Sequence, residues 1–154
     1  MNYANDHIRN VMLAGHSGSG KTTLAEAMLY LTKGTDRFGR VEDGNTVCDF
    51  DPEEIKRHTS LSMALAPVEY DGVKINLIDT PGLFDFEVGQ QEGIGAAESV
   101  LITVSARSGL TVGAQKAYKL ALKNGKSRMI YIGKVDAEHA DFYKVFEDLK
   151  SAFG

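Results

Sequence analysis

The sequence predicts an α/β fold, a three-layer sandwich in which a mostly parallel sheet lies between two layers of helices. Short apolar runs alternate along the chain with stretches of helical periodicity, an order typical of parallel strands joined by covering helices. The first apolar run leads into a glycine-rich loop, and a later run ends in the turn Asp79-Thr80-Pro81-Gly82. Both turns therefore follow strands, at the edge where open parallel sheets carry their binding sites.

Length and composition indicate one soluble domain covering residues 1–154. The net charge is −4, with 43% hydrophobic and 25% charged residues, which is ordinary for a globular protein and excludes bulk disorder. Cys48 is the only cysteine, so a disulfide framework is excluded and a reducing, cytoplasmic location is expected. No apolar stretch reaches the ~18 residues of a membrane span, and no signal peptide pattern opens the chain. The mildly acidic balance argues against direct DNA binding.

The first half of the chain begins with a predicted buried strand over residues 8 to 14, which Gly15 ends. The apolar residues Leu24, Ala25, Met28 and Leu29 predict a helix after the glycine-rich loop, and Gly34 is placed where that helix would stop. Residues 34 to 58 have no clean period and are expected to form a long loop. Its acidic run from Asp49 to Glu54 is interpreted as a solvated loop rather than a metal cage.

Alternation of Leu61, Met63 and Leu65 predicts a half-buried strand in which these side chains share the buried face. Asp71-Gly72 predicts a hairpin turn, because glycine tolerates the positive φ that a type I′ turn needs. The alternation resumes from Val73 and runs up to Asp79.

The second half predicts two further strands and three helices. A weak helix is expected from Asp85 to Glu98, because three glycines interrupt it and each costs about 1 kcal/mol relative to alanine. A strand over 99–104, a helix over 111–123 and a buried strand over 129–132 follow. The last element is an amphipathic helix with one apolar face, which consists of Phe142, Val145, Phe146, Leu149 and Phe153.

The strongest functional signal is Gly15-x4-Gly20-Lys21-Thr22, the phosphate-loop pattern, placed between a predicted strand and a predicted helix. Its glycines let successive backbone N–H groups point at phosphate oxygens, and the helix that follows directs its positive end to the same place. Lys21 adds a positive charge for the outer phosphates. The Thr22 hydroxyl is a hard oxygen ligand suited to Mg²⁺.

Two further turns carry candidate residues. The Asp79 carboxylate can hold Mg²⁺ through water, and the Gly82 N–H can reach a terminal phosphate, which would make this turn sensitive to the state of a nucleotide. In Gly133-Lys134-Val135-Asp136, the Asp136 carboxylate can accept hydrogen bonds from the N1–H and amino group of guanine, a donor pair that adenine lacks. The Lys134 stem could cover the plane of the base.

Together these motifs resemble the N-terminal GTP-binding domain of elongation factor G and its paralogues, a P-loop NTPase of the G-domain type. The resemblance covers nearly the whole chain and includes the segments 39–44, 53–57, 79–86 and 134–142. It implies a P-loop at 15–22, a first switch at about 36–60, a second switch at about 79–97 and a base-recognition loop at 133–136. It also implies a GTPase that binds GTP/GDP and Mg²⁺ and whose full-length protein acts with the ribosome.

The resemblance assigns roles to individual residues. Lys21, Ser60 and Gly82 are the expected catalytic set, and Thr22, Ser60 and Asp79 are the expected metal ligands, with Thr59 as an alternative to Ser60. The expected nucleotide contacts are Gly15, His16, Ser17, Gly18, Ser19, Gly20, Lys21, Thr22, Thr23, Asp79, Gly82, Gly133, Lys134 and Asp136.

Several positions depart from the family pattern. Leu83 stands where the family has the histidine that orients the attacking water, so slow hydrolysis is expected. Ser17 and Gly18 replace an isoleucine and an aspartate of the family's loop, and Gly133 replaces the asparagine of its base-recognition motif. Family members continue with another base-contacting loop, a strand and a helix, so the chain is expected to be a C-terminally truncated fragment.

Two other functions remain open on the sequence. A nucleotide-silent interaction module that kept the fold and lost the chemistry is consistent with Leu83 and Gly133. An ATP-dependent phosphotransferase is a weaker alternative, because it would need an acceptor site and an arginine-bearing lid, and neither is evident.

Overall fold

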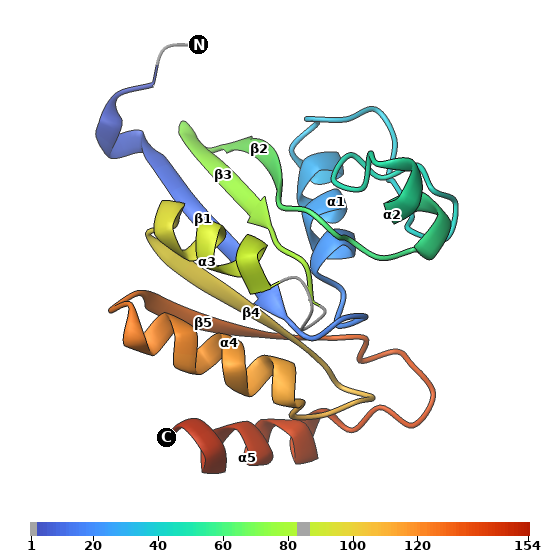
Figure 1. The fold of residues 1–154 in the computed structure, drawn as a ribbon, viewed down its shortest axis with the longest axis vertical. Helices are drawn as coiled ribbons and strands as arrows, with labels where there is room; N and C mark the ends of the chain where they lie inside the picture. The colour runs from blue at the N-terminus through green and yellow to red at the C-terminus, as the bar shows by residue number, and fades with distance from the viewer. Residues whose placement is uncertain (1–2, 83–86) are drawn as a thin grey trace.

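The computed structural model describes residues 3–82 and 87–154. Within them, five strands form one sheet in the order β2-β3-β1-β4-β5 (Figure 1). Only β2 is antiparallel to its neighbour, so the predicted α/β fold with a mostly parallel sheet is confirmed. The strands are β1 (Ile8–Gly15), β2 (Ala64–Tyr70), β3 (Val73–Asp79), β4 (Ser99–Ser105) and β5 (Ser127–Gly133).

Helices cover both faces of the sheet, as Figure 1 shows. One face carries α1 (Lys21–Leu31), with the short α2 (Pro52–Arg57) beyond it, and the other carries α3 (Glu87–Ala96), α4 (Val112–Lys123) and α5 (Phe142–Phe153). A single 3-10 turn, η1 (Asn5–His7), precedes β1. In the described part of the chain, no helix is both long and apolar enough to cross a bilayer.

The central strand β1 divides the interior into two apolar cores. Leu13 packs with Leu77 and Leu29 on the α1 face, and Met12 packs with Ile102 on the other face. Leu13 pairs with Asp79 in the parallel register of β1 and β3, so the two strands end side by side. This register brings the glycine-rich loop after β1 next to the turn after β3.

The structure corrects the predicted register of the strand before the hairpin. β2 begins at Ala64, and its buried side chains are Ala64, Ala66 and Val68, whereas Leu65 is 60% exposed. The small side chains face α1, which lies against β2. The hairpin turn itself is confirmed, with φ of 48° at Asp71 and 77° at Gly72.

The structure also corrects the burial predicted for the last strand and helix. β5 was expected to be a buried strand, but only one of its faces is covered: Ile130 and Ile132 pack on the core, whereas Met129 and Tyr131 on the other face are exposed. In α5, Val145 and Leu149 are buried but Phe142 and Phe146 are half-exposed, because the helix packs beside α4 and only part of its apolar face meets the core.

The segment 34–58 is not wholly irregular, because it contains α2. The helix starts at a capping box, with Pro52 in its first turn. The Asp51 side chain accepts from backbone N–H groups of that turn, and the Glu54 side chain accepts from the Asp51 N–H. The acidic run is also not uniformly solvated: Asp49 and Glu54 are buried, whereas Phe50 and Asp51 are exposed.

Candidate functional site

The glycine-rich loop wraps the start of α1 in a conformation that requires glycine. Gly20 caps the helix with a φ of 100°. Gly15 has a φ of 142°, and a Cβ there would lie 2.5 Å from the Thr103 carbonyl oxygen of β4. The Ser19 and Thr103 hydroxyls are 2.5 Å apart and join the loop to the same strand. The backbone curl that the sequence predicts at this loop is therefore present and is held by the sheet.

Lys21 is buried inside this loop. Its Nζ donates to the carbonyl oxygens of Gly15 at 3.3 Å and His16 at 3.2 Å. Burial lowers the pKa of Lys21, while the carboxylates of Asp79 and Asp49 act in the opposite direction. The turn after β3 lies against it, because the Ser17 N–H donates to the Gly82 carbonyl and a Cβ on Gly82 would lie 2.5 Å from Lys21 Nζ.

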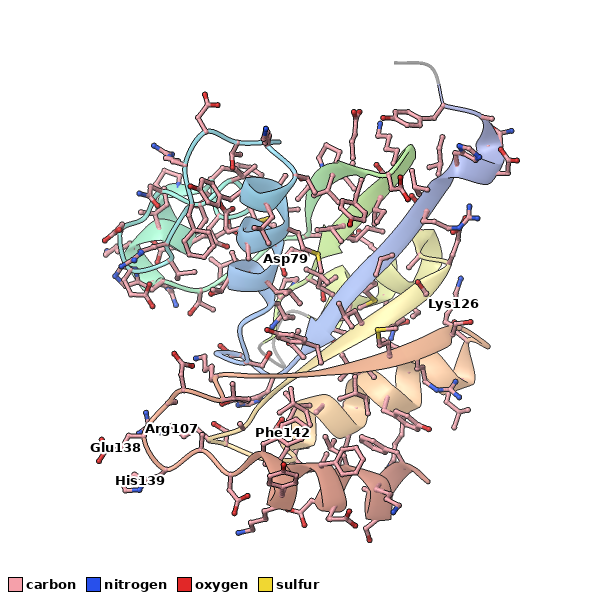
Figure 2. All side chains as sticks on the ribbon, turned by 180° about the vertical axis from the view of Figure 1, so that it is seen from behind. Asp79, Arg107, Lys126, Glu138, His139 and Phe142 are labelled. Atoms are coloured by element: carbon pink, nitrogen blue, oxygen red, sulfur yellow. The ribbon has the colours of Figure 1, made fainter. Side chains whose placement is uncertain are left out.

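Beside Lys21, two hydroxyls and two carboxylates form a cluster. The Thr22 hydroxyl donates to Asp79 Oδ2 at 2.6 Å and lies 3.1 Å from the Ser60 Oγ. The Ser60 hydroxyl in turn donates to Asp49 Oδ1 at 2.7 Å. Figure 2 shows Asp79 at the first turn of α1, far from Lys126 at the opposite end of the sheet. The structure thus brings together the three residues predicted as metal ligands.

Asp79 is almost fully buried, and its Oδ1 has no hydrogen-bond partner among the described residues. Burial raises the pKa of Asp79 to about 6, against the opposing effects of Lys21 and Thr22. A buried carboxylate oxygen without a partner is costly unless a ligand meets it. The described residues contain no group of three or more His, Cys, Asp or Glu that could hold a metal. The hydroxyl and carboxylate oxygens of this cluster, completed by phosphate or water, fit Mg²⁺ rather than a softer cation.

The cluster distinguishes Ser60 from its neighbour and adds a residue that sequence reasoning missed. The Thr59 hydroxyl donates to the Arg57 carbonyl, away from Thr22, so Ser60 is the residue that faces the loop. Asp49 was assigned to a solvated run, yet it is buried and accepts from Ser60. Its only signal in the sequence was membership of that acidic run.

The loop after β5 reaches the glycine-rich loop through Lys134, whose Nζ donates to the Gly18 carbonyl at 2.8 Å. Asp136 is exposed on the same loop. Gly133 is buried, and a Cβ there would lie 2.8 Å from Tyr131 Cε1, so the Tyr131 ring occupies the space beside the missing asparagine side chain.

These segments surround an open cleft of about 160 Å³. Leu83 lies outside the described residues, as does the part of the predicted second switch at 83–86. Six of the predicted nucleotide contacts are not in the cleft lining, although each is close in sequence or in contact with residues that are: Gly15, His16, Ser19, Asp79, Gly133 and Asp136. The lining consists of Ser17, Gly18, Gly20, Lys21, Thr22, Thr23, Val41, Glu42, Asp49, His58, Thr59, Ser60, Gly82 and Lys134.

The fold and the loop between β1 and α1 define an α/β domain of the P-loop type. Residues 6–153 match the family described as "Elongation factor Tu GTP binding domain", so the chain belongs to that family. This confirms the resemblance that the motifs indicated.

Named relatives agree with this assignment. The chain is 40% identical over 147 residues to an "Elongation factor G-like protein" of Mycobacterium tuberculosis, a match that covers 96% of this chain and 21% of that protein. It is 34% identical over 149 residues to "Ribosome-releasing factor 2, mitochondrial" of Drosophila willistoni, covering 97% and 20%. A crystal structure of a Thermus thermophilus protein superposes with a TM-score of 0.93 at 41% identity, covering 96% and 22%. The chain spans about a fifth of the length of the relatives it matches.

Proposed function

We propose that the chain is the GTP-binding domain of an elongation-factor-G-like translational GTPase. It binds Mg²⁺-GTP and hydrolyses it slowly to GDP, and the ribosome stimulates this hydrolysis through the full-length protein in the cytoplasm. The observation that carries the proposal is the cluster of Thr22, Ser60 and Asp79 beside the buried Lys21, at the start of α1.

The phosphate-binding roles follow from the partners that these groups have. Lys21 Nζ donates only weakly, to two carbonyls at more than 3 Å, and phosphate oxygens are stronger, charged acceptors. The backbone N–H groups from Ser17 to Thr22 hold the phosphates together with Lys21, and Gly82 N–H meets the terminal phosphate. Phosphate then replaces the carbonyl oxygens of Gly82 and His16 as acceptors for the Ser17 and Ser19 N–H groups. Phosphoryl transfer relies on positioning and charge stabilisation, so these contacts form the catalytic set with Ser60.

The metal-binding roles belong to Thr22, Ser60 and Asp79. Bound Mg²⁺ supplies neutralisation of the charge that develops on the β- and γ-phosphates. The Thr22 and Ser60 hydroxyls present hard oxygen donors from two different segments. Asp79 adds its Oδ1, which has no partner among the described residues. The ionised form of Asp79 is the one that this role needs.

Base recognition is proposed for residues 133–136. Asp136 accepts from the guanine N1–H and amino group, and Lys134 joins this loop to the phosphate loop through Gly18. Gly133 supplies no side-chain amide, so selection of guanine depends on Asp136. Leu83 supplies hydrocarbon where a water-orienting group is needed, which accounts for the slow hydrolysis we propose.

Equilibrium binding of GTP, GDP and ATP, each with Mg²⁺ and with EDTA, tests the proposal. We expect GTP and GDP to bind, ATP to bind far more weakly, and Mg²⁺ to favour GTP. Lys21→Ala should weaken GTP binding at least tenfold, because a charge-assisted contact contributes about 1.5–3 kcal/mol. Lys119→Ala, which removes an exposed lysine of α4 on the far face, is the matched control. Equal binding of GTP by Lys21→Ala and by the original chain would refute the assignment.

A further inference from the structure

Glu54 is a carboxylate that the roles above do not use, although it is only 1% exposed. It lies in α2, a six-residue helix of which it is the buried residue. Charged side chains are rarely this buried without a partner. The side-chain partners of Glu54 are backbone N–H groups. One belongs to Asp51, directly before the helix, and two belong to Leu61 and Ser62, which follow it.

The Glu54 carboxylate holds the segment that contains Ser60. Its Oε1 accepts from the backbone N–H groups of Leu61 and Ser62, both at 2.9 Å. The backbone carbonyl of Glu54 accepts from the Thr59 N–H at 3.2 Å. Thr59, Leu61 and Ser62, which flank Ser60, are therefore all bound to Glu54. These bonds restrict rotation of the Ser60 backbone.

The direction of the Ser60 hydroxyl follows from this constraint. Ser60 Oγ donates to Asp49 Oδ1 and lies 3.1 Å from the Thr22 Oγ1. We propose that Glu54 is a positioning residue for Ser60, which it holds toward Thr22 so that the Mg²⁺ site is assembled; the inference rests on the proposed function. Glu54 is not in the cleft lining, and its effect on the Mg²⁺ site passes through the segment 59–62.

A second contact of Glu54 gives it another role, the capping of α2, and an experiment must distinguish this role from the positioning of Ser60. Its Oε2 accepts from the Asp51 N–H at 3.2 Å and completes the capping box of α2. If capping were the whole role, loss of the Asp51 side chain would have the same effect as loss of Glu54. The Asp51 side chain accepts from the Glu53 N–H, within the first turn of the helix and away from residues 59–62. Asp51→Ala is therefore the matched control.

The experiment measures the Mg²⁺ concentration that half-saturates GTP binding by the 154-residue chain. Glu54→Ala should raise this midpoint about tenfold, the 1.4 kcal/mol equivalent of one or two lost hydrogen bonds, while binding of GDP in EDTA changes less than about twofold. Asp51→Ala should leave the midpoint within about twofold of the original chain. Glu54→Gln keeps an amide oxygen for Leu61 and Ser62 and should restore most of the Mg²⁺ response.

A double variant tests that the effect passes through Ser60. Ser60→Ala alone should raise the midpoint, and Glu54→Ala added to it should raise the midpoint no further, because coupled residues are not additive. If Glu54→Ala does not fold, Glu54→Asp carries the same test. The aspartate keeps the charge but is one methylene too short to reach both the Asp51 N–H and the N–H groups of residues 61 and 62, so it should raise the midpoint severalfold.

The outcomes separate this inference from the proposed function. Normal Mg²⁺-dependent binding by the original chain with an unchanged midpoint in Glu54→Ala or Glu54→Asp would overturn the inference alone. An equal rise in Asp51→Ala, or additive effects of Glu54→Ala and Ser60→Ala, would reduce Glu54 to a helix cap. No Mg²⁺-dependent binding by the original chain would overturn both.

Discussion

Replacing Asp79 by asparagine should make the folded chain more stable while it removes Mg²⁺-dependent nucleotide binding. Asp79 is 1% exposed, its Oδ1 has no partner among the described residues, and its Oδ2 accepts from Thr22. Asparagine has nearly the same shape and keeps an oxygen for Thr22, but carries no charge. The variant thus removes the cost of a buried charge with little change in packing.

The pKa of Asp79 gives the size and sign of this effect. Burial raises it from its ordinary value of 3.8 to about 6. Between these two values the folded chain binds a proton that the unfolded chain does not, so stability falls as pH rises through this window and stays lower above it. At about 1.36 kcal/mol per pKa unit, the loss approaches 3 kcal/mol near neutral pH. The asparagine side chain cannot ionise, so Asp79→Asn should lack this fall.

Urea unfolding followed between pH 3.5 and 7.5, in EDTA and without nucleotide, measures the difference. We expect equal free energies of unfolding at pH 3.5, and an advantage for Asp79→Asn that grows through pH 4–6 to at most about 3 kcal/mol at pH 7.5. Asp148→Asn, an exposed substitution on α5, should show no such advantage. With Mg²⁺ and GTP present the order should reverse, because a ligand that binds only the folded state stabilises it. Equal stability of the two chains at pH 7.5 in EDTA would refute the reasoning.

Three further predictions concern single positions. In Gly39→Ala the new Cβ would lie 2.9 Å from Cδ of the buried Glu26. We expect urea unfolding to show a free energy of unfolding lower by about 1–3 kcal/mol, and a smaller decrease when Glu26 is also replaced by alanine. Equal decreases in the two backgrounds would show that the two residues are not coupled. Gly133→Asn should tighten GTP binding by at most about 1 kcal/mol. The full gain in affinity should require Tyr131→Ala as well, because the Tyr131 ring lies 2.8 Å from the new Cβ. Calorimetry that finds the full gain in Gly133→Asn alone would contradict this prediction. Single-turnover hydrolysis of GTP should proceed at about 10⁻² s⁻¹ or below without the ribosome. Leu83→His should raise this rate only modestly. Fast hydrolysis by the original chain without the ribosome would refute our interpretation of Leu83.

Much of the candidate site was predictable because its residues follow strands. Thr22 and Asp79 are 57 positions apart in sequence, yet their side chains are 2.6 Å apart, since β1 and β3 are parallel neighbours that end together. A spacing pattern that places both turns after strands is sufficient to predict this proximity. The hairpin at Asp71-Gly72 was predictable for a similarly local reason, the φ that its glycine tolerates.

The contacts of the segment 39–62 were not predictable from local pattern. Asp49 and Glu54 are in an acidic run that is typical of a solvated loop, but both are buried because their oxygens meet hydroxyl and N–H donors from elsewhere in the segment. Glu26 is buried within α1 for the same kind of reason, since its Oε1 accepts from the Val47 N–H. Hydrophobic periodicity carries no information about such donors.

The sequence by itself determined the fold class, the glycine-rich loop and the turn at Asp79, because each depends on local spacing and on backbone conformations that particular residues allow. The tertiary structure decided which faces are buried. Leu65 is exposed and Ala66 is buried because α1 lies against β2. Tyr131 is exposed because the core covers the opposite face of β5, the one that carries Ile130. Strand alternation defines two faces but does not say which of them another element will cover, and that choice depends on packing between residues far apart in the chain.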